Sequence, residues 1–157
     1  MKKPGYKRYT TLIAAILLLM CTDMNGQSNW EIGGRFGNTW GLDITIPFAA
    51  PRLHPAVYFG NDVVVGAYFD WLFDLEGDPY GLKFYPGVGP ELHFGNNLDI
   101  AAAGNFGVEY SFGFPLTIAF DWRPRFMLTD QFDFNGKNWG ISARLRIGKG
   151  VRFVRSN

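Results

Sequence analysis

The sequence predicts an all-β protein: an eight-stranded antiparallel up-and-down transmembrane β-barrel with a polar, side-chain-filled lumen. After Gln27, hydrophobic residues alternate by two along almost the whole chain, and no stretch keeps a 3.6-residue apolar period. The 157 residues include 20 glycines, 15 phenylalanines, 7 tyrosines and 5 tryptophans, which favours a twisted, aromatic-rich sheet over helix. The polar face of the alternation mixes small residues with charges of both signs, as in a narrow barrel interior.

The first residues have the order of a secretory signal peptide. Basic residues up to Arg8 precede an apolar run of ten residues from Leu12 to Cys21, and a polar stretch follows. That run is about half the length of a membrane-spanning helix. We therefore predict a cleaved signal peptide over 1–26, a barrel over 27–147 and a C-terminal extension over 148–157. Alternatively, Cys21 is a lipid-modified cysteine, but Met20 before it is larger than the usual small residue.

Turn residues divide the remainder into eight runs and set the register of two hairpins. A turn at 60–62 places opposite residues at numbers that sum to 122, and a turn at 95–97 places them at numbers that sum to 192. The eight runs lie at about 29–37, 39–47, 52–59, 63–73, 81–94, 98–112, 115–127 and 138–147.

This register places opposite charges across from each other on the polar face. The three pairs are Arg52 with Asp70, Lys83 with Glu109, and His93 with Asp99. Opposite charges suit a lumen, because an unpaired charge away from water is costly. Ordinary surface salt bridges are the alternative interpretation. We predict a structural charge network in the lumen, formed by Arg52, Asp70, Lys83, Glu109, His93, Asp99, Asp121, Arg123 and Arg144.

Strand length and aromatic placement favour a membrane barrel. Most runs are longer than the usual soluble strand of about 5–6 residues and suit the roughly 9–11 tilted residues that cross a bilayer. Tryptophan and phenylalanine gather near the predicted strand ends, as in the aromatic girdles of membrane barrels. Alternation alone does not say which face is inside, so a soluble periplasmic lipocalin-like binder of an apolar ligand is the alternative.

Four segments of the chain resemble the small eight-stranded outer-membrane β-barrels of Gram-negative bacteria, most closely a Bacteroidetes-type family. They begin at Tyr80 (YGLKFYPGVGP), Phe106 (FGVEYSF), Pro115 (PLTIAFDWRP) and Trp139 (WGISARLRI). The resemblance covers roughly residues 29–147 and implies an outer-membrane location without catalytic activity. Such barrels commonly end on an aromatic residue that the insertion machinery reads, whereas this chain continues to Asn157.

The chain offers few residues for catalysis. We expect no enzyme, because His93 and Ser111 lie at opposite ends of one predicted hairpin, roughly 40 Å apart. His54 faces Tyr68 across its hairpin and is expected to be a hydrogen-bonded lumen residue. The lone Cys21 excludes an internal disulfide and a zinc site built on several cysteines, and we expect no cofactor or metal.

The remaining expectations concern partners and transport. Fifteen basic residues against fourteen acidic ones give no basic surface for nucleic acid. Eight strands leave a lumen that side chains fill, so a continuous water channel is not expected. The charges crowding it also include Asp43, Glu91, Arg35 and Arg146. We expect a monomer in contact with outer-membrane lipid, lipopolysaccharide and, during biogenesis, the insertion machinery. A lipid-modifying outer-membrane enzyme and a narrow pore are the alternatives.

Overall fold

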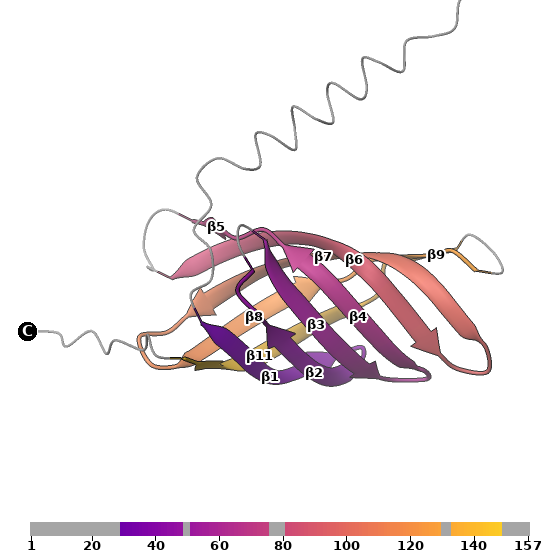
Figure 1. The fold of residues 1–157 in the computed structure, drawn as a ribbon, viewed down its shortest axis with the longest axis horizontal. Helices are drawn as coiled ribbons and strands as arrows, with labels where there is room; N and C mark the ends of the chain where they lie inside the picture. The colour runs from indigo at the N-terminus through magenta and orange to yellow at the C-terminus, as the bar shows by residue number, and fades with distance from the viewer. Residues whose placement is uncertain (1–28, 49–50, 76–80, 130–132, 149–157) are drawn as a thin grey trace, which may run out of the picture.

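The described residues form a closed barrel of eight antiparallel strands (Figure 1). The computed structural model describes residues 29–48, 51–75, 81–129 and 133–148, and in these ranges all regular structure is β. The strands are β1 (Trp30–Gly37), β2 (Trp40–Thr45), β3 (Arg52–Phe59), β4 (Val63–Asp70), β5 (Phe73–Asp74), β6 (Leu82–Phe94), β7 (Leu98–Ser111), β8 (Leu116–Trp122), β9 (Arg125–Met127), β10 (Phe134–Asn135) and β11 (Trp139–Ile147).

Pairing between β1 and β11 closes the ring. Trp30 lies opposite Ile147 and Gly37 lies opposite Gly140 in an antiparallel register. Around the barrel the order is β1, β2, β3, β4, β6, β7, β8 and β11, so strands adjacent in the ring follow one another along the chain. The predicted all-β class, the strand number and the up-and-down order are confirmed.

The two predicted hairpin registers are also confirmed. In the first hairpin, Arg52 lies opposite Asp70 and His54 lies opposite Tyr68. In the second, Lys83 lies opposite Glu109, and the pairing of β6 with β7 runs from Leu82 to Phe94 without a break. These two strands are the longest in the barrel, with 13 and 14 residues.

Two of the predicted runs are each divided into two strands in the structure. In both cases the interruption lies at a residue pair that contains a proline. The Trp71 amide donates to the Pro86 carbonyl at 2.9 Å, and the Gly104 amide donates to the Pro124 carbonyl at 2.8 Å. Proline has no N–H to return the second bond of each pair. The run predicted at 63–73 is therefore divided into β4 and β5, and the run at 115–127 into β8 and β9.

The region between the runs predicted at 115–127 and 138–147 contains one further strand. Phe134 and Asn135 form β10, which pairs with Phe126 and Arg125 of β9. The predicted signal peptide and residues 149–157 of the predicted extension lie outside the described residues. Within the described ranges, no helix has the length and apolar character needed to cross a membrane.

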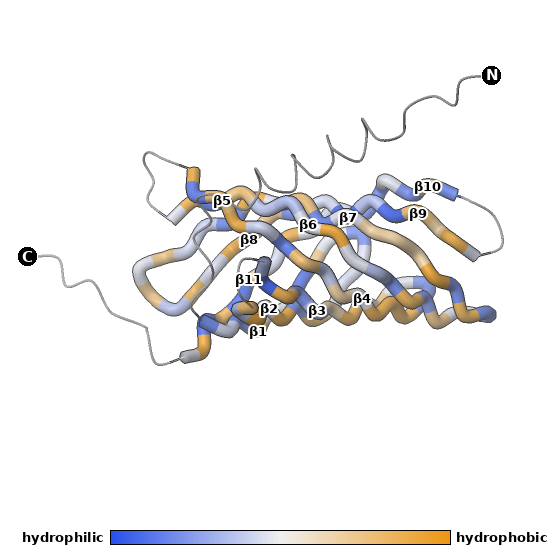
Figure 2. Tube along the Cα trace, turned by 45° about the horizontal axis from the view of Figure 1, so that its top comes forward, coloured by the Kyte–Doolittle hydropathy of each residue, from blue (hydrophilic) through white to orange (hydrophobic). Residues whose placement is uncertain are grey.

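Hydropathy alternates along the strands, as the tube in Figure 2 shows. Arg35 of β1 is 0% exposed, whereas its neighbour Phe36 is 65% exposed. On β11, Arg144 is likewise 0% exposed and Leu145 is 58% exposed. Charged side chains thus lie on the buried face and large apolar side chains on the exposed one.

The two ends of the barrel differ in their connections. The short turns at 38–39, 60–62 and 95–97 share one end, which we call the hairpin end, with the β9–β10 hairpin. The opposite end holds Trp30 and Ile147, where the described barrel sequence begins and ends (Figure 1).

Close backbone approach between β1 and β11 requires glycine at position 33. A Cβ atom added to Gly33 would lie 1.9 Å from the Ala143 carbonyl oxygen and 2.6 Å from the Arg144 Cα. Both neighbours are backbone atoms of the strand that closes the ring, so relief would require the strands to separate. At Gly113, by contrast, an added Cβ meets nothing within 4 Å.

We predict that Gly33→Ala destabilises the barrel by about 2 kcal/mol, because the added methyl group pushes β1 away from β11. Gly113→Ala serves as the matched control and should change the free energy of unfolding by less than about 0.5 kcal/mol. Urea unfolding of the two purified variants and the unmodified protein measures both values. Equal stability of the two variants would contradict the close approach.

Candidate functional site

The most distinctive group of residues is a set of ionisable side chains buried inside the barrel. The described residues include six buried carboxylates, five buried guanidinium groups and two buried imidazoles. We call this set the interior network. It consists of Glu31, Asp43, Asp70, Glu91, Glu109, Asp121, Arg35, Arg52, Arg123, Arg125, Arg144, His54 and His93.

One part of the network joins strands that are not neighbours in the ring. Arg144 of β11 lies 2.9 Å from Glu31 (Nε to Oε2) and 2.6 Å from Glu109 of β7 (Nη2 to Oε2). Arg52 of β3 reaches the same Glu109 carboxylate at 2.8 Å. The Thr117 hydroxyl donates to Glu31 at 2.9 Å. Glu109 therefore links β3, β7 and β11 across the interior.

Asp70 connects this part to the centre of the barrel. Its Oδ2 lies 3.2 Å from Arg52 Nε and 2.6 Å from His54 Nδ1. Its other oxygen accepts a hydrogen bond of 2.7 Å from the Asn105 side-chain amide. His54 continues the chain of contacts, since its Nε2 lies 3.5 Å from Asp43 Oδ2. All of these side chains except Arg52, which is 1% exposed, are 0% exposed.

Arg123 lies between the end of β8 and the beginning of β9, and its side chain contacts two carboxylates of the interior network. Its guanidinium group lies 3.1 Å from Asp43 and 3.2 Å from Asp121. Its Nε donates to the Asn105 side-chain carbonyl at 2.9 Å. Arg35 binds the same Asp121 carboxylate at 2.7 Å. Each of these two carboxylates thus has an arginine beside it, as buried charges require.

Tyrosine rings surround the central arginines. The Arg123 guanidinium carbon lies 5.0 Å from the centre of the Tyr58 ring and 5.1 Å from that of Tyr68. Arg52 lies 4.7 Å from the Tyr85 ring centre. These distances are within the range of cation–π attraction.

A third part of the network lies towards the hairpin end. Glu91 accepts a hydrogen bond of 2.5 Å from the Tyr68 hydroxyl and lies 2.9 Å from His93 Nε2. Arg125 Nη1 lies 3.4 Å from the same carboxylate.

Two predicted charge pairs are corrected by the side-chain contacts. Lys83 lies opposite Glu109, but its amine contacts Asp74 at 3.3 Å, because Arg52 and Arg144 already hold the Glu109 carboxylate. The Lys83 side chain is 21% exposed and lies apart from the interior network.

His93 lies opposite Asp99 in the ladder, but it contacts Glu91 instead. Asp99 accepts a hydrogen bond of 2.7 Å from the Thr129 hydroxyl. Of the three predicted pairs, only Arg52 and Asp70 are in contact. The structure places the other predicted residues, Asp121, Arg123 and Arg144, inside the network.

Glu31 is not among the residues predicted for the network, although a signal for it is present in the sequence. Glu31, Gly33 and Arg35 are spaced by two residues in the first run, so Glu31 lies on the same face as Arg35. The Tyr58 contact with Arg123 carries no comparable signal, because it crosses the interior between strands distant in the ring.

The buried Ser142 hydroxyl and the His54 imidazole are both bound to carboxylates. Ser142 donates to Asp43 at 2.7 Å, and His54 contacts Asp70 and Asp43. A nucleophile–base pair instead needs the imidazole beside the hydroxyl. Within the described ranges, no group of three His, Cys, Asp or Glu side chains is placed to hold a metal ion.

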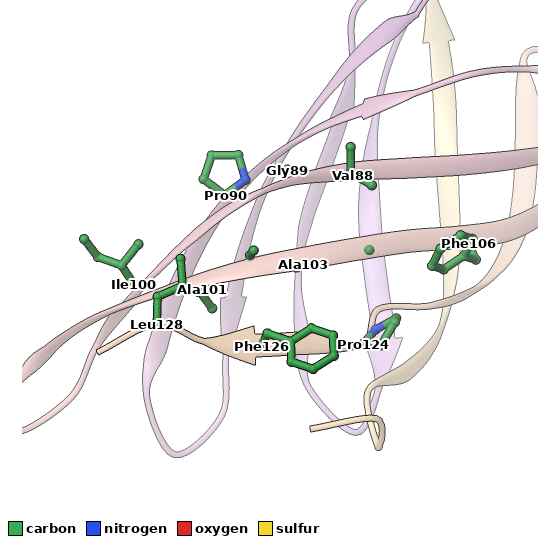
Figure 3. Close-up of a pocket in the computed structure, with 12 residues that line it drawn as sticks. Val88, Gly89, Pro90, Ile100, Ala101, Ala103, Phe106, Pro124, Phe126 and Leu128 are labelled. Carbon is green, nitrogen blue, oxygen red and sulfur yellow. The ribbon is translucent and has the colours of Figure 1, made fainter. Parts of the chain in front are cut away.

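An apolar groove of about 550 Å³ lies between β6, β7 and β9. Figure 3 shows Pro90, Phe106 and Phe126 among the side chains that line it. The small residues Ala102 and Gly104 of β7 line it as well. Four of the lining residues are exposed hydrophobics, and they are Val88, Ile100, Phe126 and Leu128.

Comparison with protein-family models, curated proteins and solved structures finds no match to this chain. The arrangement of the network itself therefore carries the functional argument. The ion pairs of the interior network cross the interior and connect strands that are not neighbours in the ring, such as β3 with β7 and β7 with β11.

We predict that Asp70→Asn destabilises the folded barrel by about 3 kcal/mol, because it removes the negative charge that Arg52 and His54 share. Asp62→Asn, in the exposed turn at 60–62, is the control and should change stability by less than about 0.5 kcal/mol. Urea unfolding of the purified proteins gives both values. If the network does not stabilise the fold, the two variants will be equally stable.

Proposed function

We propose that the protein is an integral β-barrel of the bacterial outer membrane, with a structural role in the envelope, a polar side-chain-filled lumen and no catalytic activity. The observation that carries the proposal is the inverted distribution of hydrophobicity. The largest fully buried side chains are arginines, whereas 27 large hydrophobic side chains in the described residues are exposed.

Water is a poor solvent for such an exterior. Fully burying one large apolar side chain is worth about 1.5–3 kcal/mol, and soluble monomers rarely expose apolar patches above a few hundred Å². Lipid removes this penalty. In the proposed setting the apolar groove beside Phe126 faces acyl chains, and its lining needs no other partner.

Aromatic clusters at both ends of the barrel support the same setting. Towards the hairpin end, the Trp122 and Trp139 rings stack at 5.4 Å, and Trp139 stacks on Phe120 at 5.6 Å. Near the opposite end, the centre of the Phe112 ring lies 4.7 Å from that of Tyr110 and 5.1 Å from that of Phe114. Two separated aromatic groups are typical of membrane barrels, which place them at the two interfaces.

The proposal also assigns an orientation. An exported chain with periplasmic termini would place Trp30 and Ile147 at the periplasmic side and the hairpin end at the cell surface. Outer-membrane lipid, lipopolysaccharide and the insertion machinery are the partners that this setting requires. Membership of a Bacteroidetes-type family stays a prediction.

The interior argues against the soluble alternative. A lipocalin-like binder of an apolar ligand needs an apolar internal cavity, whereas Arg123, Asp43 and Asp121 occupy the centre of this barrel. The same side chains fill the path that a pore would need.

We expect the expressed protein to fractionate with the outer membrane and to shift its mobility in SDS gels only after boiling, because a membrane barrel stays folded in SDS at room temperature. The measurement is membrane fractionation followed by paired boiled and unboiled gel lanes. Recovery in the soluble periplasm without a heat-dependent shift would overturn the proposal.

A charge on the exposed apolar face gives an independent test. Val108 is 39% exposed and Ile118 is 40% exposed. We predict that Val108→Arg or Ile118→Arg lowers stability in lipid by about 2 kcal/mol and reduces the inserted fraction. In a protein whose exterior faced water, these exposed positions would accept arginine without loss.

The control for both variants is Asn96→Arg, which adds the same charge to the exposed turn at 95–97. It should insert as the unmodified protein does. The heat-dependent gel shift after refolding into vesicles measures the inserted fraction of all three variants.

A further inference from the structure

A polar hollow of about 160 Å³ lies at the hairpin end, apart from the apolar groove. It lies where the β1–β2 turn meets β9, β10 and the segment before β11. Two cationic side chains and four neutral hydrogen-bonding ones line it. These are Arg125, Lys137, Asn38, Thr39, Asn135 and Asn138.

Asn138 is 3% exposed, and its two side-chain polar atoms differ in their contacts. Its carbonyl oxygen accepts hydrogen bonds from Arg35 Nη1 at 3.2 Å and from the Thr39 hydroxyl at 3.4 Å. These donors fix the orientation of the amide. Its Nδ2 is buried and has no acceptor among the described residues. A buried N–H group without an acceptor is unusual in folded proteins.

Arg125 presents a second donor without an acceptor. The residue is 9% exposed, and its Nη1 contacts Glu91 and His93. Its Nε is buried and has no hydrogen-bond partner within the described ranges. The carboxylates deeper in the barrel are already bound, Glu91 by Tyr68 and His93, and Asp121 by Arg35 and Arg123.

Lys137 adds a positive charge at the exposed side of the hollow. Within the described ranges, the Lys137 amine forms no ion pair with a carboxylate. Among the described residues, the hollow thus combines an ammonium group without a carboxylate partner, one arginine and at least two donors without acceptors. Charged and neutral N–H donors in this combination suit the oxygens of an anion.

We propose that this hollow binds an oxyanion, namely a phosphate group, at the mouth of the barrel. Lys137 and Arg125 supply the charge, and the Asn138 Nδ2 supplies a directed hydrogen bond. The phosphate group comes either from free phosphate in the medium or from the phosphorylated sugar of a neighbouring lipid A. The second source rests on the proposed function, and the first does not.

Inorganic phosphate is the first probe. The full chain, refolded in dodecyl maltoside micelles, is titrated with phosphate by calorimetry in a phosphate-free buffer. Lys137→Gln removes the free charge and should weaken binding at least about tenfold. Asn138→Asp keeps the acceptor for Arg35 and Thr39 but turns the buried donor into a negative oxygen, so it should weaken binding at least as much.

Lys83→Gln is the matched control, because it removes a lysine whose partner is Asp74, far from the hollow in the ladder. It should bind phosphate as the unmodified protein does. The far-UV circular dichroism spectrum of each variant, which does not depend on a membrane location, shows whether the barrel is folded. Folded Lys137→Gln and Asn138→Asp proteins with unchanged affinity would overturn the proposal.

Lipid A, added to the same micelles before and after chemical removal of its phosphates, is the second probe. Binding of the phosphorylated form alone, lost in the same two variants, supports a lipid-linked phosphate. Binding of inorganic phosphate alone supports a free ligand. Failure of both probes to bind folded protein overturns the site. Membrane fractionation tests the location separately, so a soluble protein that still binds phosphate would contradict the proposed function and support the hollow.

Discussion

Compensation of charge inside a closed ring is the constraint on which the rest of this structure depends. The charged side chains on the inner face are buried, so they have little water to solvate them. They are stabilised by each other instead. Arg52 joins Asp70 to Glu109, and Arg123 joins Asp43 to Asp121. Since both partners of such a pair must be present together, the positions of β2, β3, β4, β7 and β8 depend on one another.

The exterior follows from the same alternation. Once the charged residues of each strand lie inside, the period of two places their apolar neighbours outside. Phe36 and Leu145 are exposed because Arg35 and Arg144 are buried. The apolar surface is therefore a geometric consequence of the interior, and it determines the solvent in which the barrel can be stable.

Most of the fold could be predicted from the sequence, because strands, turns and hairpin registers are local. The run predicted at 52–59 has the bounds of β3, and the sums of residue numbers gave the correct opposite residues in both hairpins. The interruptions at Pro86 and Pro124 were missed, although the lost N–H groups can be read from the sequence. The alternation by two shows only on which face of the sheet a side chain lies, and it does not show where a backbone hydrogen bond is lost.

The contacts of the interior could be predicted only in part. Cross-strand arithmetic finds neighbours on adjacent strands, and it found Arg52 with Asp70. Long arginine side chains instead reach across the barrel, as Arg144 of β11 does to Glu109 of β7. Such contacts depend on the diameter and strand tilt of the closed ring, which no local pattern contains. For this reason Glu109 was predicted as the partner of Lys83, although Arg52 and Arg144 from two other strands contact the Glu109 carboxylate.

The pairing of β1 with β11 also sets the order of events when the chain is made. Trp30 is among the first barrel residues to be synthesised, and its partner Ile147 is the last residue of the final strand. Until then one edge of β1 has unpaired N–H and C=O groups that can pair with another chain. Contacts between residues so distant in sequence also form slowly. The ring can therefore close only after β11 has been made, and the open edge of β1 has to be kept from pairing with other chains until then.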